Sequence, residues 1–237
     1  RILDGVGSPA VQVYYDVANM HKEGYDIYKE IRQLGAERIC QFHCKENGHL
    51  LGKGPIDFRK VKQAIDAFCE AGLMGASFDA EDGGLQLPYL LQTAISAWFS
   101  AANWGTSGYA GLTVAAGNLL AEHASQEQKE RYLHPMVQGQ SFGTMALSEP
   151  HAGSSVGDIR TRAEPQEDGT YRLFGNKMWI SGADHEMSEN LINLVLAKIP
   201  GGPPGVKGIS LFIVPRDRVN EDGSRGARND VKLAGLN

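Results

Sequence analysis

The sequence has few cysteines, no excess of basic residues and no long hydrophobic run. Its three cysteines, an odd number in a chain of 237 residues, argue against a disulfide-stabilised scaffold and favour a reducing, cytoplasmic location. The net charge of −5 gives no support for a nucleic-acid partner, because such partners are bound by basic surfaces. No apolar run approaches the roughly 18 to 20 residues that cross a bilayer, so we expect no transmembrane segment.

The first residues, RILDGVGSPA, also lack features of a natural N-terminus. They contain no apolar core of about 7 to 15 residues, so they do not resemble a signal peptide. They begin with Arg1 rather than methionine, which predicts that the chain starts within a longer protein. We find no internal repeat and no low-complexity tract.

Three successive patterns of hydrophobicity predict a composite chain. Residues 1–68 have a β-α-β-α order, with β-branched and aromatic segments at residues 11–17 and 38–45, as in a parallel α/β fold. In the last helix of this segment, Phe58, Val61, Ile65 and Phe68 form an apolar stripe. Residues 69–140 are helical in pattern, apart from the turn FDAEDGGLQLP. Residues 141–237 alternate short β-rich segments with turn residues, which predicts an incomplete antiparallel β-domain.

Several elements can be placed more closely. Residues 89–104 are largely apolar and predict a long buried helix, and residues 112–124 predict another. Ser125 and Gln128 have the spacing of a capping box at the start of a further helix. In the β-domain we expect strands within residues 141–149, 158–166, 170–181, 190–199 and 208–216.

Two segments of the β-domain have residues suited to a ligand. MALSEPHAGSSVGD (145–158) is a strand followed by a loop rich in Gly, Ser and Pro, whose N–H groups and hydroxyls suit a planar cofactor edge or a phosphate. In NKMWISGADH (176–185), Trp179 and Ser181 share one strand face and could stack on a flat ring and bond to its edge. Taken singly, each segment is better explained without a ligand, the first as a plain β-turn and the second as a core tryptophan beside a turn serine.

Together these segments resemble the flavin-binding segments of the acyl-CoA dehydrogenase family. CEAGLMGASFDAEDGGLQLP and LLAEHASQEQKERYLHPMVQGQ resemble its N-terminal helical domain, and NLVLAKIPGGPPGVKGISLFIVPR resembles its methylmercaptopropionyl-CoA branch. The resemblance covers residues 69–237. It implies a helical N-terminal domain at 69–140, a truncated flavin-binding β-domain at 141–237, and no C-terminal helical bundle.

The resemblance also implies a function and a site. It implies FAD as cofactor, an acyl-CoA thioester as substrate of fatty acid metabolism, an electron-transfer flavoprotein or similar acceptor, and a homo-oligomer for the intact protein. Ser148 would bond near the flavin N5 and Ser154 would lie near the CoA moiety. The implied cofactor-binding residues are Met145, Ala146, Leu147, Ser148, Ser154, Trp179, Ile180 and Ser181.

The sequence departs from the family at two loop positions and lacks one functional group. His151 stands where glycine is usual, and Ser155 where aspartate is common. The family's catalytic glutamate belongs to the C-terminal bundle, and Glu81, Asp82 and Glu149 are poor substitutes by position. We therefore assign no catalytic base, and expect this chain alone to be an inactive fragment of an oxidoreductase that acts on CH–CH bonds.

The segment ERICQFHCKENGHLLGKG (37–54) carries a Cys/His cluster. On a strand, Cys40 and Cys44 face away from His43, so these residues do not converge on zinc, as closely spaced cysteines do from a turn. The two sulfurs would lie roughly 13 Å apart, beyond disulfide reach. His43 is instead expected beside Asp16, which ends the preceding strand, and an Asp and a His at adjacent strand ends can share one divalent cation.

VYYDVANMHKEGYDIYKEIRQLG and RICQFHCKENGHLLGKGPIDFRKV resemble the C-terminal part of a sugar-phosphate isomerase/epimerase of the xylose-isomerase-like TIM barrel group. The resemblance implies metal ligands at Asp16 and His43, with Lys45 as a substrate contact, and a divalent metal only if this segment keeps isomerase function. The two glutamate ligands of that family are missing from residues 1–68. A barrel needs roughly 200 residues, so we expect an incomplete site without activity.

The join of the two resemblances falls near residues 66–70. Three explanations are open: a chimera made by assembly or gene prediction, a natural fusion, or an accidental match in which residues 1–68 are a divergent dehydrogenase N-terminus. The corresponding functions are a dehydrogenase fragment, an isomerase fragment, and a fragment without catalysis or ligand. For the last we predict exposed apolar surface, because helix 89–104 has lost its bundle partner.

Overall fold

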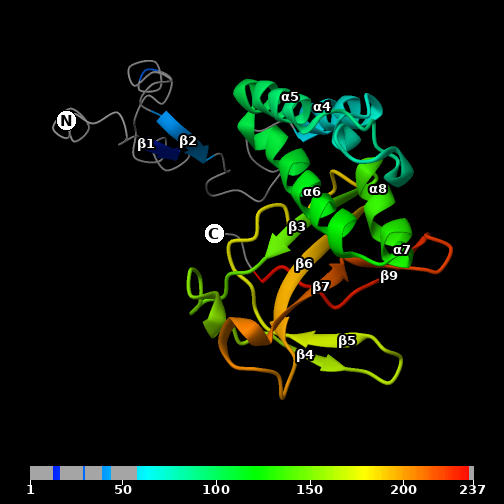
Figure 1. Cartoon of the computed structure of the whole chain (residues 1–237). Coiled ribbons are helices and arrows are strands. Elements are labelled where there is room, and N and C mark those ends of the chain that lie inside the picture. The colour runs from blue at the N-terminus through cyan, green and yellow to red at the C-terminus, as the bar shows by residue number, and fades with distance from the viewer. Residues whose placement is uncertain (1–12, 17–28, 30–38, 44–57, 235–237) are drawn as a thin grey trace.

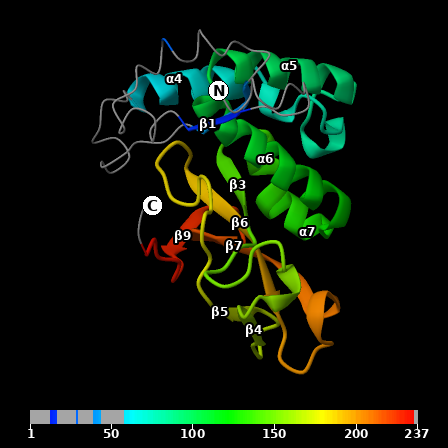
Figure 2. The ribbon, with the colours of Figure 1, turned by 90° about the vertical axis from the view of Figure 1, so that its left-hand side faces the viewer.

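The computed structural model describes residues 13–16, 29, 39–43 and 58–234. From residue 58 onward, a layer of helices lies against one β-sheet. A β-hairpin formed by residues 162–174 extends from the sheet away from the helices (Figures 1 and 2). Strands β1 (Val13–Asp16) and β2 (Ile39–His43) pair in parallel in a two-stranded sheet of their own. This pairing confirms the two strands predicted in the first segment and their parallel direction.

The helical layer follows the predicted order. Its α-helices are α4 (Phe58–Glu70), α5 (Tyr89–Ala102), α6 (Trp104–His123), α7 (Gln126–Gln128) and α8 (His134–Val137). One π-helical turn, η3 (Lys129–Leu133), joins α7 to α8, and the short turns η1 (Leu73–Gly75) and η2 (Ala80–Asp82) precede α5.

Two helix starts are set by side-chain caps. The predicted capping box is present, since the Ser125 hydroxyl accepts from the Gln128 N–H and the Gln128 side chain accepts from the Ser125 N–H. The Asn103 side chain accepts from the Thr106 N–H at 2.9 Å and starts α6. Because Asn103 is extended, it divides the predicted helix 89–104, and Trp104 belongs to α6. The helix predicted at 112–124 therefore begins earlier, at Trp104.

The sheet of the β-domain is mixed, so the prediction of an antiparallel domain was wrong in direction. Its strands are β3 (Ser141–Ala146), β4 (Arg162–Pro165), β5 (Tyr171–Phe174), β6 (Asn190–Lys198) and β7 (Ile209–Pro215). β3 pairs with β6 in parallel, whereas β6–β7 and β4–β5 are antiparallel. The long segment between β3 and β6 returns the chain to the same end of the sheet, which parallel pairing requires. A hairpin of β8 (Asp217–Val219) and β9 (Arg225–Arg228) follows.

The core lies between the helices and β6. Leu191 and Ile192 are adjacent in β6, and each is almost fully buried in a different apolar cluster. Ile192 and Leu194 pack with residues of α6 and α8. Leu191 packs with Ile65 and Phe68 of α4, two members of the apolar stripe predicted for that helix. A strand buried on both faces accounts for the nearly continuous apolar sequence NLINLVLAK.

Helix α6 approaches β3 closely at Gly143. A Cβ atom at this position would lie 2.5 Å from the Cβ atom of Ala116 in α6. The Thr113 hydroxyl of α6 accepts from the Gly143 N–H at 3.1 Å and donates to the Tyr109 carbonyl at 2.8 Å. The helix therefore supplies the partner that this N–H lacks within the sheet.

Helix α5 is exposed on its apolar side, contrary to the prediction of a buried helix. Leu90 and Trp98 are 79% and 81% exposed, and Tyr89 is exposed as well. The apolar sequence of α5 predicted that the helix packs against another element. It did not show whether that element belongs to this chain. The exposed apolar surface expected for a fragment is therefore present on α5. Among the described helices, none is long and apolar enough to cross a membrane.

We expect Leu194→Ala to lower the free energy of unfolding by about 2 to 5 kcal/mol, because it leaves a cavity beside β6 at a fully buried position. Leu90→Ala is the matched control, expected to change it by less than about 0.5 kcal/mol. Urea denaturation measures both values. Equal losses in the two variants would contradict the assignment of the core.

We also expect the chain to bind a hydrophobic dye such as ANS at the α5 surface, since clustered exposed apolar side chains attract such ligands. The double substitution Leu90→Gln and Trp98→Gln should lower the dye fluorescence to about half or less. Glu122→Gln, on the exposed side of α6, should leave it unchanged. A monodisperse chain that binds no dye would refute this expectation.

Candidate functional site

The two segments predicted to bind a ligand lie side by side. The first follows the end of β3, and the second follows β5. The Met178 N–H donates to the Ser148 carbonyl at 2.9 Å. The Lys177 ammonium group donates to the Leu147 carbonyl at 3.0 Å. Segments about 30 residues apart in sequence are thus joined at their ligand-binding residues.

The eight predicted cofactor-binding residues fall into two groups at this junction. Met145 and Ala146 end β3, Leu147 and Ser148 follow directly, and Ser154 is exposed in the next loop. Trp179, Ile180 and Ser181 form the loop on the other side. In the part of the chain that the structure describes, the hydroxyls of Ser148, Ser154 and Ser181 make no hydrogen bond, so they are available to a ligand.

Trp179 does not lie in a strand, so the predicted strand 170–181 was wrong beyond Phe174. β5 ends at Phe174, and the chain leaves the hairpin to reach Ser148. Trp179 has a φ of 61°, a left-handed conformation that is unfavourable for a bulky residue. Its side chain is 69% exposed. The predicted common strand face of Trp179 and Ser181 is therefore absent, although both lie in the same short loop.

A buried carboxylate, Glu149, holds the first segment in place against the loop before β4 and the second segment. Its side chain accepts hydrogen bonds from the backbone N–H groups of Arg160 and Thr161, at 2.7 and 3.0 Å, and from the Thr161 hydroxyl. Lys177 forms an ion pair with it at 2.9 Å. Its backbone closes a tight turn with Ala152. Glu149 thus connects β3, the loop before β4, and the second segment.

These contacts also fix the charge of Glu149. Burial of the carboxyl raises its pKa, but the hydrogen bonds from Thr161, the Arg160 N–H and Lys177 outweigh burial and lower the pKa to about 2. Glu149 is therefore ionised at neutral pH and fully occupied by donors. Such a carboxylate is a poor proton acceptor, which agrees with its exclusion as a catalytic base.

An open cavity of about 300 Å³ lies next to Glu149. None of the eight predicted cofactor-binding residues lines it. The ligand prediction therefore rests on the junction of the two segments, and not on this cavity. The lining residues are Glu149, Pro150, His151, Arg160, Thr161, Arg162, Phe174, Gly175 and Asn176.

The loop after Ser181 contacts the helical layer through His185. Its ring packs edge-on against Tyr109 of α6 and Phe142 of β3, at centroid distances of 4.9 and 5.8 Å. Burial and the charge of Arg216, opposed by Asp184, lower the pKa of His185 to about 4. The imidazole is therefore neutral at pH 7, and its Nδ1 accepts from the Met187 N–H at 3.1 Å.

The sequence did not predict that Lys177 and Thr161 bind the Glu149 carboxylate, or that Glu149 holds the two segments together. One signal was available, since Glu149 in the first segment and Lys177 in the second carry opposite charges, and the two segments were expected to meet at one ligand. Thr161 carried no such signal, because its role depends on how the loop before β4 returns to Glu149.

The predicted metal pair is described only by its backbone. Asp16 and His43 are partners in the parallel register of β1 and β2. Their side chains, and residues Cys44, Lys45 and His49, lie outside what the structure describes. In the described part of the chain no three His, Cys, Asp or Glu side chains gather as a metal site.

Glu149→Gln should lower stability at pH 7 and much less at pH 3. The folded-state pKa of about 2 lies below the ordinary 4.5, so Glu149 stabilises the protein above pH about 4.5, and this is lost as pH falls toward 2. The difference at pH 7 should be on the order of 3 kcal/mol. Urea unfolding at pH 7, 5, 4 and 3 tests this. Glu167→Gln, at an exposed turn, serves as control and should change stability by less than about 0.5 kcal/mol. A difference that does not shrink with pH would contradict the prediction.

Two models of one protein family match this chain. The acyl-CoA dehydrogenase N-terminal domain matches residues 23–140, and the acyl-CoA dehydrogenase middle domain matches residues 144–234. The first match begins at residue 23, so it overlaps the segment predicted as part of a barrel.

Individual relatives agree with these matches. A butyryl-CoA dehydrogenase of Syntrophomonas wolfei is 40% identical over 176 residues, 74% of this chain and 29% of that protein. A 3-methylmercaptopropionyl-CoA dehydrogenase of Ruegeria pomeroyi is 38% identical over 175 residues, 74% of this chain and 30% of that protein. The crystal structure of an acyl-CoA dehydrogenase complexed with FAD from Bacillus anthracis has a TM-score of 0.57 and 31% identity, over 68% of this chain and 27% of that chain.

This chain thus spans less than a third of the length of these curated relatives. The helical layer and the mixed sheet described above correspond in order to the two matched domains. The chain belongs to the acyl-CoA dehydrogenase family.

Proposed function

We propose that this chain forms the FAD-binding part of an acyl-CoA dehydrogenase, an oxidoreductase that introduces a double bond between the alpha and beta carbons of an acyl-CoA thioester. The observation that carries the proposal is the junction of the two predicted flavin segments, with Met178 bonded to Ser148. Membership of the family supports the reaction class and the cofactor.

The residues at the junction fit a flat, hydrogen-bonding ring. Trp179 offers an exposed aromatic face, and Ser148 and Ser181 offer hydroxyls without partners in the described part of the chain. Trp179 and Ile180 would cover the isoalloxazine ring and exclude water, while the serine hydroxyls would bond to its edge. When bound, the flavin supplies the acceptor for a hydride from the beta carbon. Ser154, exposed in the adjacent loop, would contact the CoA moiety.

The proposal assigns binding, and not proton abstraction, to this chain. Glu149 is the carboxylate closest in sequence to the proposed flavin contacts, but Thr161, Arg160 and Lys177 occupy its oxygens. Its pKa of about 2 makes it a weak base at neutral pH. We therefore propose that the chain alone binds FAD without catalysing the dehydrogenation.

Finer assignments rest on the family resemblance. The methylmercaptopropionyl-CoA branch is supported by one relative, but a butyryl-CoA dehydrogenase is equally similar, so the acyl group is left open. The electron-transfer flavoprotein acceptor, the homo-oligomer and the cytoplasmic location stay predictions. For the alternative, an isomerase fragment, the parallel register of Asp16 with His43 is the one supporting observation, and that alternative stays a prediction too.

Trp179→Ala should raise the dissociation constant of FAD at least about fivefold, since stacking of an aromatic side chain on a flat ring contributes about 1 to 3 kcal/mol. Trp98→Ala is the matched control, because Trp98 is even more exposed but lies on α5. Titration of flavin fluorescence with the purified chain measures both constants. Colourless protein that takes up no added FAD, or equal affinity in the two variants, would refute the proposal.

A further inference from the structure

Arg216 lies between β7 and β8 and is only 1% exposed. Its backbone is fixed on both sides, since its N–H donates to the Leu191 carbonyl at 2.7 Å and its carbonyl accepts from the Asn229 N–H at 2.8 Å. A fully buried arginine is costly unless its charge and donors are satisfied. Its contacts therefore indicate why the protein retains it.

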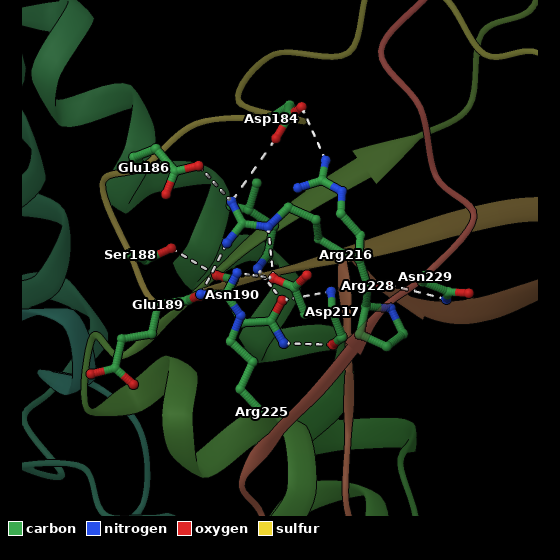
Figure 3. A network of polar contacts seen from close by, with 12 residues as sticks. Asp184, Glu186, Ser188, Glu189, Asn190, Arg216, Asp217, Arg225, Arg228 and Asn229 are labelled. Carbon is green, nitrogen blue, oxygen red and sulfur yellow. Dashed lines mark hydrogen bonds and ion pairs between the residues drawn. The ribbon is translucent and has the colours of Figure 1, made fainter.

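The guanidinium group of Arg216 divides its donors between one carboxylate and two backbone carbonyls (Figure 3). Nε donates to the Asp217 carboxylate at 3.0 Å. Nη1 donates to the His185 carbonyl at 2.6 Å, and Nη2 to the Glu189 carbonyl at 3.0 Å. The Asp184 and Glu186 carboxylates lie 3.9 Å from Nη1. One rigid planar group thus holds two points of the backbone at a fixed separation.

Both carbonyls belong to the loop of residues 182–189. This loop joins Trp179–Ser181 to the start of β6 and has no regular secondary structure. The Glu189 carbonyl precedes β6 directly, and His185 lies near the middle of the loop. Arg216 therefore holds the segment that directly follows Trp179–Ser181 and connects it to β6.

Charge balance alone does not require this arrangement. Asp217 is already paired with Arg225 at 2.8 Å, and Arg228 reaches Asp184 at 3.3 Å. A buried ion pair can often be replaced by apolar residues without loss of stability. The distinctive contribution of Arg216 is its fork of donors to two carbonyls of one loop, which lysine cannot reproduce.

We propose that Arg216 is a positioning residue for the flavin-contacting loop Trp179–Ser181, acting through the carbonyls of His185 and Glu189. The inference rests on the proposed function of that loop. Arg216 makes no hydrogen bond or ion pair with the proposed flavin residues themselves, so its effect on FAD passes through the backbone of residues 182–189.

The test compares Arg216→Lys with Arg225→Lys in the full chain. Both substitutions keep the charge beside Asp217, but only the first removes the two loop contacts. Arg216→Lys should raise the dissociation constant of FAD at least about tenfold, and Arg225→Lys less than about twofold. At saturating FAD, the visible circular dichroism of the flavin should change in Arg216→Lys alone, which a general loss of stability would not produce.

Identical affinity and flavin dichroism in the two variants would overturn the inference. If wild-type protein binds no FAD, the proposed function fails, and amide hydrogen exchange then decides about Arg216. Exchange of residues 182–189 should be faster in Arg216→Lys than in wild type and Arg225→Lys, and equal rates would refute the role.

If Arg216→Lys does not fold, the wild-type chain still provides a test. Residues 182–189 should exchange more slowly, relative to their intrinsic rates, than residues 199–205 of the β6–β7 loop. Equal protection of the two loops would overturn the inference.

Discussion

The parallel pairing of β3 with β6 is the constraint on which the β-domain depends. Ser141 is opposite Asn190 and Ala146 is opposite Val195, so both strands run in the same direction. The chain leaves β3 at the end where the ligand segments meet and must return along the whole strand before β6 begins. A strand of this length spans roughly 20 Å. Residues 182–189 complete that return without a ladder of hydrogen bonds; one backbone bond, from the Glu189 N–H to the Gln140 carbonyl at 2.9 Å, holds their end, and side chains hold the rest. His185 supplies an aromatic contact and Arg216 supplies two hydrogen bonds.

At two places in this domain, buried charged side chains connect segments that are distant in sequence. Glu149 with Lys177 joins the loop after β3 to the segment after β5. Arg216 with Asp217 joins the end of β7 to the loop before β6. In each case a charged group satisfies backbone groups distant in sequence, which an apolar pair of the same size cannot do. Removal of one partner from a buried pair costs about 3 to 5 kcal/mol, so each pair also makes the domain sensitive to single substitutions.

Local signals in the sequence predicted local structure well. The apolar stripe of α4, the capping box at Ser125 and the strands β3, β6 and β7 follow from periodicity and side-chain chemistry, and the structure confirms them. The predictions from sequence were wrong where contacts between residues distant in sequence determine the structure. The conformation of Trp179 depends on the bond from Met178 to Ser148, and the exposure of α5 depends on which residues face it. The direction of β3 relative to β6 depends on a crossover, which strand patterns do not encode.

In the first 68 residues, resemblance to short motifs does not establish which family the segment comes from. β1 and β2 pair in parallel, as the barrel resemblance predicts, but a parallel pair of short strands is common to many folds. Helix α4 runs without interruption across residues 66–70, where the two resemblances meet. Ile65 and Phe68 of that helix share a core cluster with Phe142 and Leu191 of the β-domain, and the dehydrogenase N-terminal model matches from residue 23. A join at 66–70 would have to create this packing by chance, whereas a divergent dehydrogenase N-terminus would produce it directly. Packing across a suspected join is therefore a sharper criterion of common origin than the residues on either side of it.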